Sequence, residues 1–82
     1  MENNYLLNIE QSILSSIIYD NKLIELLVSK GLVYEDFTSM AHQEIFKIMT
    51  KLSKSYIDIN EINIANENDN LENSLIQILS TN

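Results

Sequence analysis

The 82-residue sequence contains no cysteine, no proline and no tryptophan, and it has a single glycine, Gly31. Without cysteine, neither a disulfide framework nor a thiolate metal site is available. β-Sandwiches and barrels need many turns, and these turns usually contain glycine and proline. The scarcity of both residues, together with 45% hydrophobic residues, predicts helices joined by Asn, Asp and Ser loops.

Arginine is also absent, so twelve acidic residues face five lysines and the net charge is −7. Tight binding to nucleic acid needs cationic side chains that displace counterions from phosphates, and a duplex repels a chain with this balance. Lys47, Lys51 and Lys54 share part of one predicted helix surface, which we interpret as a solvated face rather than a phosphate contact. We therefore expect no tight DNA binding by this domain, and a protein as its partner in any role near DNA.

Long apolar segments are missing as well. The longest unbroken apolar runs, such as residues 26–28, have three residues, whereas a membrane-spanning helix needs about 20. Residues 1–4 are polar and acidic where a signal peptide would be basic. We expect a soluble, cytoplasmic protein with no membrane partner.

The predicted fold class is all-α, a compact orthogonal bundle of about five short helices in one domain, residues 1–82. Residues 1–7 are a candidate flexible arm. A core of this size is marginal, so self-association or docking onto a larger assembly would stabilise it.

Helical spacing of apolar residues predicts the helices themselves. The predicted spans are residues 8–19, 21–30, 39–53, 58–66 and 71–79. The predicted inward side chains are Ile9, Ile13, Leu14, Ile17 and Ile18; Leu23, Ile24 and Leu27; Ala41, Ile45, Phe46, Ile48, Met49 and Leu52; and Leu71, Leu75, Ile76 and Leu79.

Capping residues mark several helix ends. Asn8 and Gln11 have the spacing of a capping box for the first helix, and Ser39 is a natural N-cap for the third. Gly31 supplies the left-handed residue that ends the second helix after Lys30.

The start of the fourth helix has two interpretations. Residues 56–59 alternate between polar and apolar and are compatible with a short strand. We favour a helix start, because Asp58 and Glu61 have the spacing of a capping box and Ile57 and Ile62 that of a hydrophobic staple around it.

No constellation of residues demands catalysis. One glycine cannot build a glycine-rich phosphate-binding loop, which excludes nucleotide hydrolysis by this chain. His42 is the only histidine, so no His-x-x-x-His metal pair exists. We interpret His42 as a residue of the first helical turn that bonds locally or lines a partly buried seam, with a base or a metal ligand as the alternative.

Carboxylates and aromatic residues receive the same structural interpretation. Capping accounts for Asp58 and Glu61, and Asp36 is a candidate anchor in the loop before the third helix. Tyr34, Phe37 and Phe46 are expected to seal the core there, with a binding hot spot as the alternative; Tyr5 and Tyr19 are expected to be at least partly exposed. We assign no catalytic, cofactor-binding, metal or partner-binding residues.

Four segments carry a resemblance to the N-terminal domain of bacterial replicative DNA helicases of the DnaB type. Residues 10–20, EQSILSSIIYD, resemble the family's E-Q-x-V-L-G-x-x-x-x-D. Residues 36–46 contain DF and HQEIF, which resemble D-F-Y and H-x-x-I-F at matching spacing. Leu52 with residues 57–58 resembles L…P-I-D, and residues 79–82 fall where the family has L…T-P. The resemblance covers residues 6–82.

Three positions depart from the family pattern. Ser15 and Ser16 replace a pair of glycines, and Tyr56 replaces the proline of P-I-D. Residues 66–71 are shorter than usual and lack the common G-x-L-D…G-G connection, which puts any partner contact through that loop in doubt.

The resemblance implies a hexameric ring helicase in which N-terminal domains form a collar that helps hold the ring together and receive primase. This chain would be the globular head, with the family's helical hairpin and ATPase domain outside it. It would not be an enzyme itself, and ATP and Mg would bind to the ATPase domain. Its partners would be primase and the other helicase subunits.

Two other interpretations stay open. The helicase-binding C-terminal region of primase resembles the same helical fold, although Met1 close to the EQSIL segment favours the helicase N-terminus. A free-standing acidic helical regulator that sequesters a basic partner is the second. An enzyme ranks behind both.

Overall fold

The computed structural model describes residues 2–80, with side chains from Tyr5 onward, and in this part of the chain there is no strand. The all-α prediction is therefore confirmed. Five α-helices are joined by short loops and two 3-10 turns. They are α1 (Glu2–Tyr19), α2 (Leu23–Ser29), η1 (Tyr34–Asp36), α3 (Met40–Lys54), α4 (Glu61–Glu67), η2 (Asp69–Leu71) and α5 (Glu72–Leu79).

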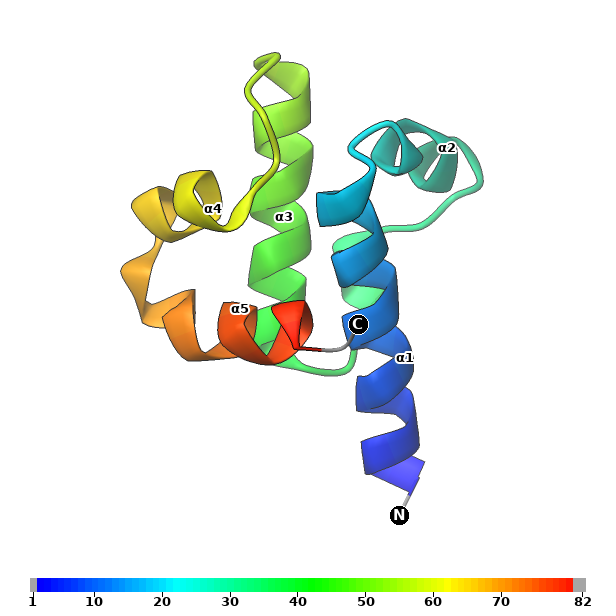
Figure 1. Cartoon of the computed structure of the whole chain (residues 1–82). Helices are drawn as coiled ribbons and strands as arrows, with labels where there is room; N and C mark the ends of the chain where they lie inside the picture. The colour runs from blue at the N-terminus through cyan, green and yellow to red at the C-terminus, as the bar shows by residue number, and fades with distance from the viewer. Residues whose placement is uncertain (1, 81–82) are drawn as a thin grey trace.

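Helix α3 lies at the centre of the bundle (Figure 1). Helix α1 packs against α3 and α5, while α2 packs against α1 and α3, and α4 packs against α3. In the view of Figure 1, α2 and α4 lie on opposite sides of α3, and α5 runs across α1 and α3. The N-terminal end of α1 extends beyond the other helices.

The core is built around the inner face of α3. Five of its apolar side chains are buried: Ile45, Phe46, Ile48, Met49 and Leu52. This confirms the stripe that its 3.6-residue periodicity predicts. Phe37, just before α3, is also buried, and its ring centroid lies 5.2 Å from that of Phe46. The expectation that these two aromatic residues seal the core is confirmed.

Helix α1 is longer than predicted. It begins at Glu2, not Asn8, so Asn8 and Gln11 lie inside the helix and form no capping box. No proline or glycine in residues 2–7 ends the helical backbone there. Its buried face is also narrower than predicted. Leu14 and Ile17 are fully buried, whereas Ile9 is 42% exposed although the adjacent Glu10 is buried, so Ile9 lies outside the buried face.

The prediction for the inner face of α5 was partly wrong. Leu71 and Leu75 are buried as predicted, but the third buried residue is Ile78, while Ile76 and Leu79 are exposed. Positions 71, 75 and 78 are spaced i, i+4 and i+7 and share one face of a helix. The tertiary packing against α1 selects this face over the neighbouring one, which is equally apolar in sequence.

The start of α4 was predicted two residues too early. Its N-cap is Asn60, whose Oδ1 accepts from the Asn63 backbone N–H at 2.8 Å, and not Asp58. Ile59 and Ile64 occupy the staple positions around this cap, and both are buried in the core. Ile62, assigned to the staple from sequence, is exposed.

The side chain of Asn21 explains why the chain stays extended up to Ile59. Its Nδ2 donates to the carbonyl of Ile17 at 2.9 Å and to the carbonyl of Ile59 at 3.0 Å, while its Oδ1 accepts from the Ile59 N–H at 2.9 Å. The amide thus closes the end of α1 and pairs with both backbone groups of Ile59. A helix that started at Asp58 would turn the Ile59 carbonyl into the helix, as the acceptor for the Asn63 N–H, and would break its bond to Asn21.

Two helices end with the same backbone motif, a left-handed residue after the C-cap. After α2, Gly31 has φ +99°, and the Leu32 N–H donates to the Leu27 carbonyl at 3.0 Å. After α3, Tyr56 has φ +59°, and the Ile57 N–H donates to the Leu52 carbonyl at 2.9 Å. Both are Schellman ends. The prediction for Gly31 is confirmed, whereas Tyr56 occupies a conformation that favours glycine.

Replacing Tyr56 with glycine is therefore expected to stabilise the fold. A left-handed conformation costs an L-residue about 1–2 kcal/mol, and the greater freedom of glycine in the unfolded chain offsets about 0.4–1 kcal/mol of that. Tyr56 is 97% exposed, so few contacts are lost. We expect Tyr56→Gly to raise Tm by several degrees, measured by thermal unfolding followed by circular dichroism.

The matched control is Ser55→Gly, one residue earlier, where φ is −93°. Glycine brings no conformational gain there, so this variant should be neutral or destabilised. A Tm of Tyr56→Gly at or below that of the wild type would contradict the expected strain at Tyr56.

Candidate functional site

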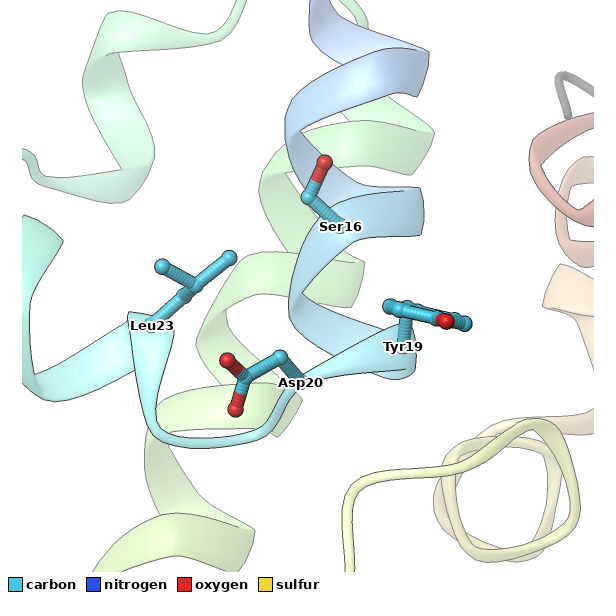
Figure 2. A pocket seen from close by; sticks show the side chains of 4 residues that line it. All are labelled: Ser16, Tyr19, Asp20 and Leu23. Atoms are coloured by element: carbon cyan, nitrogen blue, oxygen red, sulfur yellow. The ribbon is translucent and has the colours of Figure 1, made fainter.

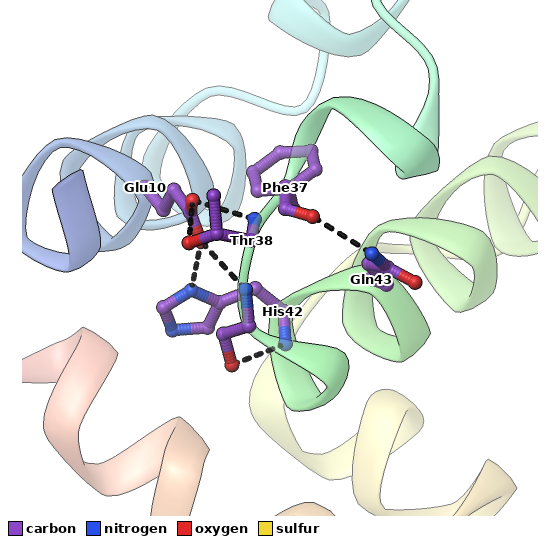
Figure 3. A network of polar contacts seen from close by, with 6 residues as sticks. Glu10, Phe37, Thr38, His42 and Gln43 are labelled. Carbon is purple, nitrogen blue, oxygen red and sulfur yellow. Dashed lines mark hydrogen bonds and ion pairs between the residues drawn. The ribbon is translucent and has the colours of Figure 1, made fainter. Parts of the chain in front are cut away.

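A polar cluster is buried where α1 meets the start of α3 (Figure 3). Glu10 on α1 and His42 in the first turn of α3 are 6% and 3% exposed. His42 Nδ1 lies 2.7 Å from Glu10 Oε1. Because an ionised carboxylate only accepts, Nδ1 carries the proton and donates to Glu10.

Glu10 also binds the backbone at the start of α3. Its Oε2 accepts from the Thr38 N–H and from the Thr38 hydroxyl, both at 2.7 Å, and its Oε1 accepts from the Ser39 N–H at 3.4 Å. Ser39 in turn caps α3 through its hydroxyl, which accepts from the His42 N–H at 3.3 Å. Glu10 thus brings a negative charge from α1 to the positive end of α3. We call these four residues the Glu10 junction.

The pKa of the Glu10 carboxyl reflects two opposing effects. Burial raises the pKa, because it disfavours the charged form, whereas hydrogen bonds from His42, Thr38 and Ser39 lower it. The hydrogen bonds together outweigh the burial, so the pKa lies below its ordinary value. The junction therefore holds Glu10 ionised at neutral pH.

The geometry of the Glu10 junction is that of a structural contact. Both carboxylate oxygens of Glu10 already accept hydrogen bonds. In residues 2–80 no three His, Cys, Asp or Glu side chains group closely enough to hold a metal ion. His42 lines a buried seam as expected. Its side chain binds Glu10, 32 residues away, so of the two expected roles, a local bond or a place in a seam, the side chain has the second.

A shallow hollow lies at the corner between α1 and α2 (Figure 2). It has a volume of about 330 Å³ and is lined by Ser16, Tyr19, Asp20 and Leu23. The Ser16 hydroxyl donates to the Ser12 carbonyl at 2.8 Å, and Asp20 Oδ1 accepts from the Lys22 N–H at 3.2 Å. Both polar side chains thus serve local backbone contacts, and the Ser16 hydroxyl donates to a backbone carbonyl rather than to a general base.

The carboxylates that the sequence analysis named, Asp36 and Asp58, have separate structural roles. Asp36 Oδ2 accepts from the Val33 N–H at 2.9 Å, which confirms it as a loop anchor. Asp58 contributes its backbone carbonyl, which accepts from Asn63 Nδ2 at 2.8 Å. The capping role assigned to the Asp58 side chain was wrong, since Asn60 caps α4.

Two of the three lysines on the surface of α3, Lys47 and Lys51, form ion pairs there. Lys47 Nζ lies 3.2 Å from Glu44 and 4.3 Å from the centroid of the Tyr34 ring. Lys51 Nζ lies 2.6 Å from Glu67 of α4. These contacts favour a solvated helix face, as predicted. Among the side chains of residues 5–80, Lys54 has no ion-pair partner.

A membrane span is not found among the described residues: none of their helices combines the length and apolarity that crossing a bilayer requires.

The fold and the Glu10 junction together define a class: a small helical domain whose buried polar residues hold helices together. Comparison with known protein families identifies a family of such helical domains that this chain matches. The family model of the DnaB-like helicase N-terminal domain matches residues 2–80. The chain therefore belongs to the DnaB-like helicase N-terminal domain family, a domain that is itself non-catalytic. Neither the curated proteins nor the solved structures yield a match.

Glu10 belongs to the EQSIL segment, but its contact with His42 was not predicted from the sequence. One signal was present, because a glutamate four residues before Leu14 and seven before Ile17 lies on the face of α1 that is buried. A carboxylate on a core face requires a buried partner. His42, the only histidine, was the one side chain that combines a titratable donor with a place beside the core.

Glu10→Gln should destabilise the domain markedly. The amide keeps the volume but loses the charge that strengthens contacts with His42 and with the start of α3. Hydrogen bonds to charged groups contribute about 1.5–3 kcal/mol each, and the amide keeps part of this, so we expect a loss of roughly 2–3 kcal/mol in the free energy of unfolding. Urea denaturation at pH 7 measures it. The control, Glu44→Gln at an exposed ion pair, should change stability by less than about 1 kcal/mol. Equal effects of the two substitutions would contradict the junction.

The contribution of Glu10 should disappear in acid. The unfolded chain binds a proton at Glu10 near the ordinary pKa of 4.5, whereas the folded chain does so at lower pH. Stability from this group is therefore full above pH 4.5 and is lost as the pH falls through the folded value. The stability difference between wild type and Glu10→Gln should shrink as the pH falls below 4.5. A difference that stays constant between pH 7 and pH 3 would contradict this prediction.

Proposed function

We propose that this chain is the non-catalytic collar domain at the N-terminus of a hexameric replicative DNA helicase, where it supports ring assembly and docks primase during DNA replication. The observation that carries the proposal is the family match over residues 2–80 of a wholly helical domain. The protein acts in the cytoplasm, within the primosome. ATP and Mg bind to the ATPase domain of the helicase.

The surface supports a role in protein contacts. The net charge of −7 repels a nucleic-acid backbone, and two of the three α3 lysines are paired with glutamates. The side chains of Glu10 and His42 are buried and bonded to each other, so the Glu10 junction presents no free carboxylate to a substrate. The chain therefore acts by presenting a shaped surface to primase and to neighbouring helicase subunits.

Calorimetric titration with the C-terminal region of primase from the same organism tests the docking role. We expect saturable binding to the folded chain at pH 7. The control is the same titration after thermal unfolding, which should remove the heat of binding. ATP turnover by the purified chain, measured in parallel, should be zero; measurable turnover would overturn the scaffold role outright.

A second arm tests ring assembly in the helicase that carries the domain. Removal of residues 2–80 should lower the fraction of hexamer in sedimentation and the amount of primase recruited. If the truncated helicase forms rings and recruits primase at wild-type levels, and the isolated chain binds no primase, the proposed function is wrong.

A further inference from the structure

A partly open apolar groove runs between α2 and α3. It consists of two adjoining hollows of about 280 and 160 Å³ that share Val28 and Thr50. Its apolar lining comes from Ile24, Val28, Leu32, Val33 and Phe46. Val28 and Val33 remain 44% and 46% exposed, so the groove is not filled by this chain's own side chains. We call it the α2–α3 groove.

The charged residues of the groove lie at one of its ends. Lys54 and Glu25 line the larger hollow there. Lys54 has no ion-pair partner among the side chains described, those of residues 5–80. A ligand with an aliphatic side chain for the hollows and a carboxylate for Lys54 would fit this arrangement.

The opposite side of the molecule carries such a group. On α4, Ile62 is 65% exposed, which makes it the most exposed of the Leu, Ile and Val side chains described. Glu61 precedes it and is also exposed. Helices α2 and α4 both pack against α3, and in the view of Figure 1 they lie on opposite sides of it, so α4 of one molecule does not cover its own α2–α3 groove.

The charges of the chain are divided in the same way. Residues 55–82 contain five carboxylates and no lysine, whereas residues 21–54 contain all five lysines and four carboxylates. The segment that forms the groove is thus the only part of this acidic chain that is not strongly negative. This distribution of charge favours contact between the α4 side of one molecule and the groove side of another over contact between two α4 sides.

We propose that the α2–α3 groove is the docking site for α4 of a second copy of this chain, with Ile62 in the groove and Glu61 beside Lys54. Because the two surfaces lie on opposite sides of α3, the contact is head-to-tail, and such contacts form rings when the rotation closes. It rests on the proposed function, since it names the surfaces through which neighbouring collar domains would meet.

Complementary variants test the contact in the isolated chain. Val28→Glu blocks the groove, and Ile62→Asp removes the side chain that enters it. Both positions are exposed enough to spare the fold, which circular dichroism checks. Sedimentation at low salt should show the wild-type mass rising above 9.5 kDa with concentration, up to ~1 mM. Each variant alone should lose at least about tenfold in association constant. Salt should weaken wild-type association, because exposed charges are screened.

Mixing the two variants should restore one intact contact, since Val28→Glu keeps its α4 and Ile62→Asp keeps its groove. The mixture should form a two-chain species and nothing larger. The control Ile76→Asp, at an exposed isoleucine of α5, should associate like the wild type.

Three results would each overturn the contact: a wild-type chain that stays at 9.5 kDa, single variants that associate like the wild type, or a mixture without a two-chain species. Primase binding is read separately by calorimetry. Retained primase binding with any of these results would therefore reject the α2–α3 groove contact and leave the proposed function standing.

Discussion

The negative charge of Glu10, placed on the core face of α1, is the constraint on which the arrangement of the bundle depends. A carboxylate there is tolerated only if donors meet it, and the start of α3 supplies four: Thr38 N–H and hydroxyl, Ser39 N–H and His42 Nδ1. The axial position and rotation of α1 relative to α3 are thereby set by directional bonds. Apolar packing of Leu14 and Ile17 alone would tolerate small slips between the two helices. Asn21 performs the same task at the other end of α1, where it binds Ile59.

Features of the fold that depend on neighbouring residues could be predicted from the sequence, whereas features that depend on contacts between distant residues could not. Helix α3 was predicted almost to the residue, because its apolar period and the Ser39 cap are both local signals. The Schellman end at Gly31 was predicted for the same reason. The inner face of α5 was not: Leu71, Leu75, Ile76, Ile78 and Leu79 are all apolar, and only contact with α1 decides which are buried. The predicted N-cap of α4 was wrong because Asn21, 38 residues from Ile59, decides where the extended segment ends.

The same distinction separates the two halves of the Glu10 junction. The Ser39 cap was visible in sequence, whereas the pairing of Glu10 with His42 requires the packing of α1 on α3, which spacing along the chain does not encode. Both residues belong to segments that resemble the family, Glu10 to EQSIL and His42 to HQEIF, but a sequence pattern does not show that two side chains touch. Their contact gives a physical reason why the two residues occur together in one domain: Glu10 is the buried charge and His42 is its donor.

The near absence of glycine has a consequence for function as well as for fold. With Gly31 as the only glycine, the chain ends α3 through Tyr56 in a left-handed conformation and closes other turns with Asn and Asp side chains. Hydrogen-bonded turns of this kind are more rigid than glycine-rich loops, and no phosphate-binding loop is possible among them. Rigid corners suit the proposed collar role, in which surfaces are held at fixed positions. The exposed face of α4 is bordered by such a corner at Asn60, whose side chain accepts from the Asn63 N–H.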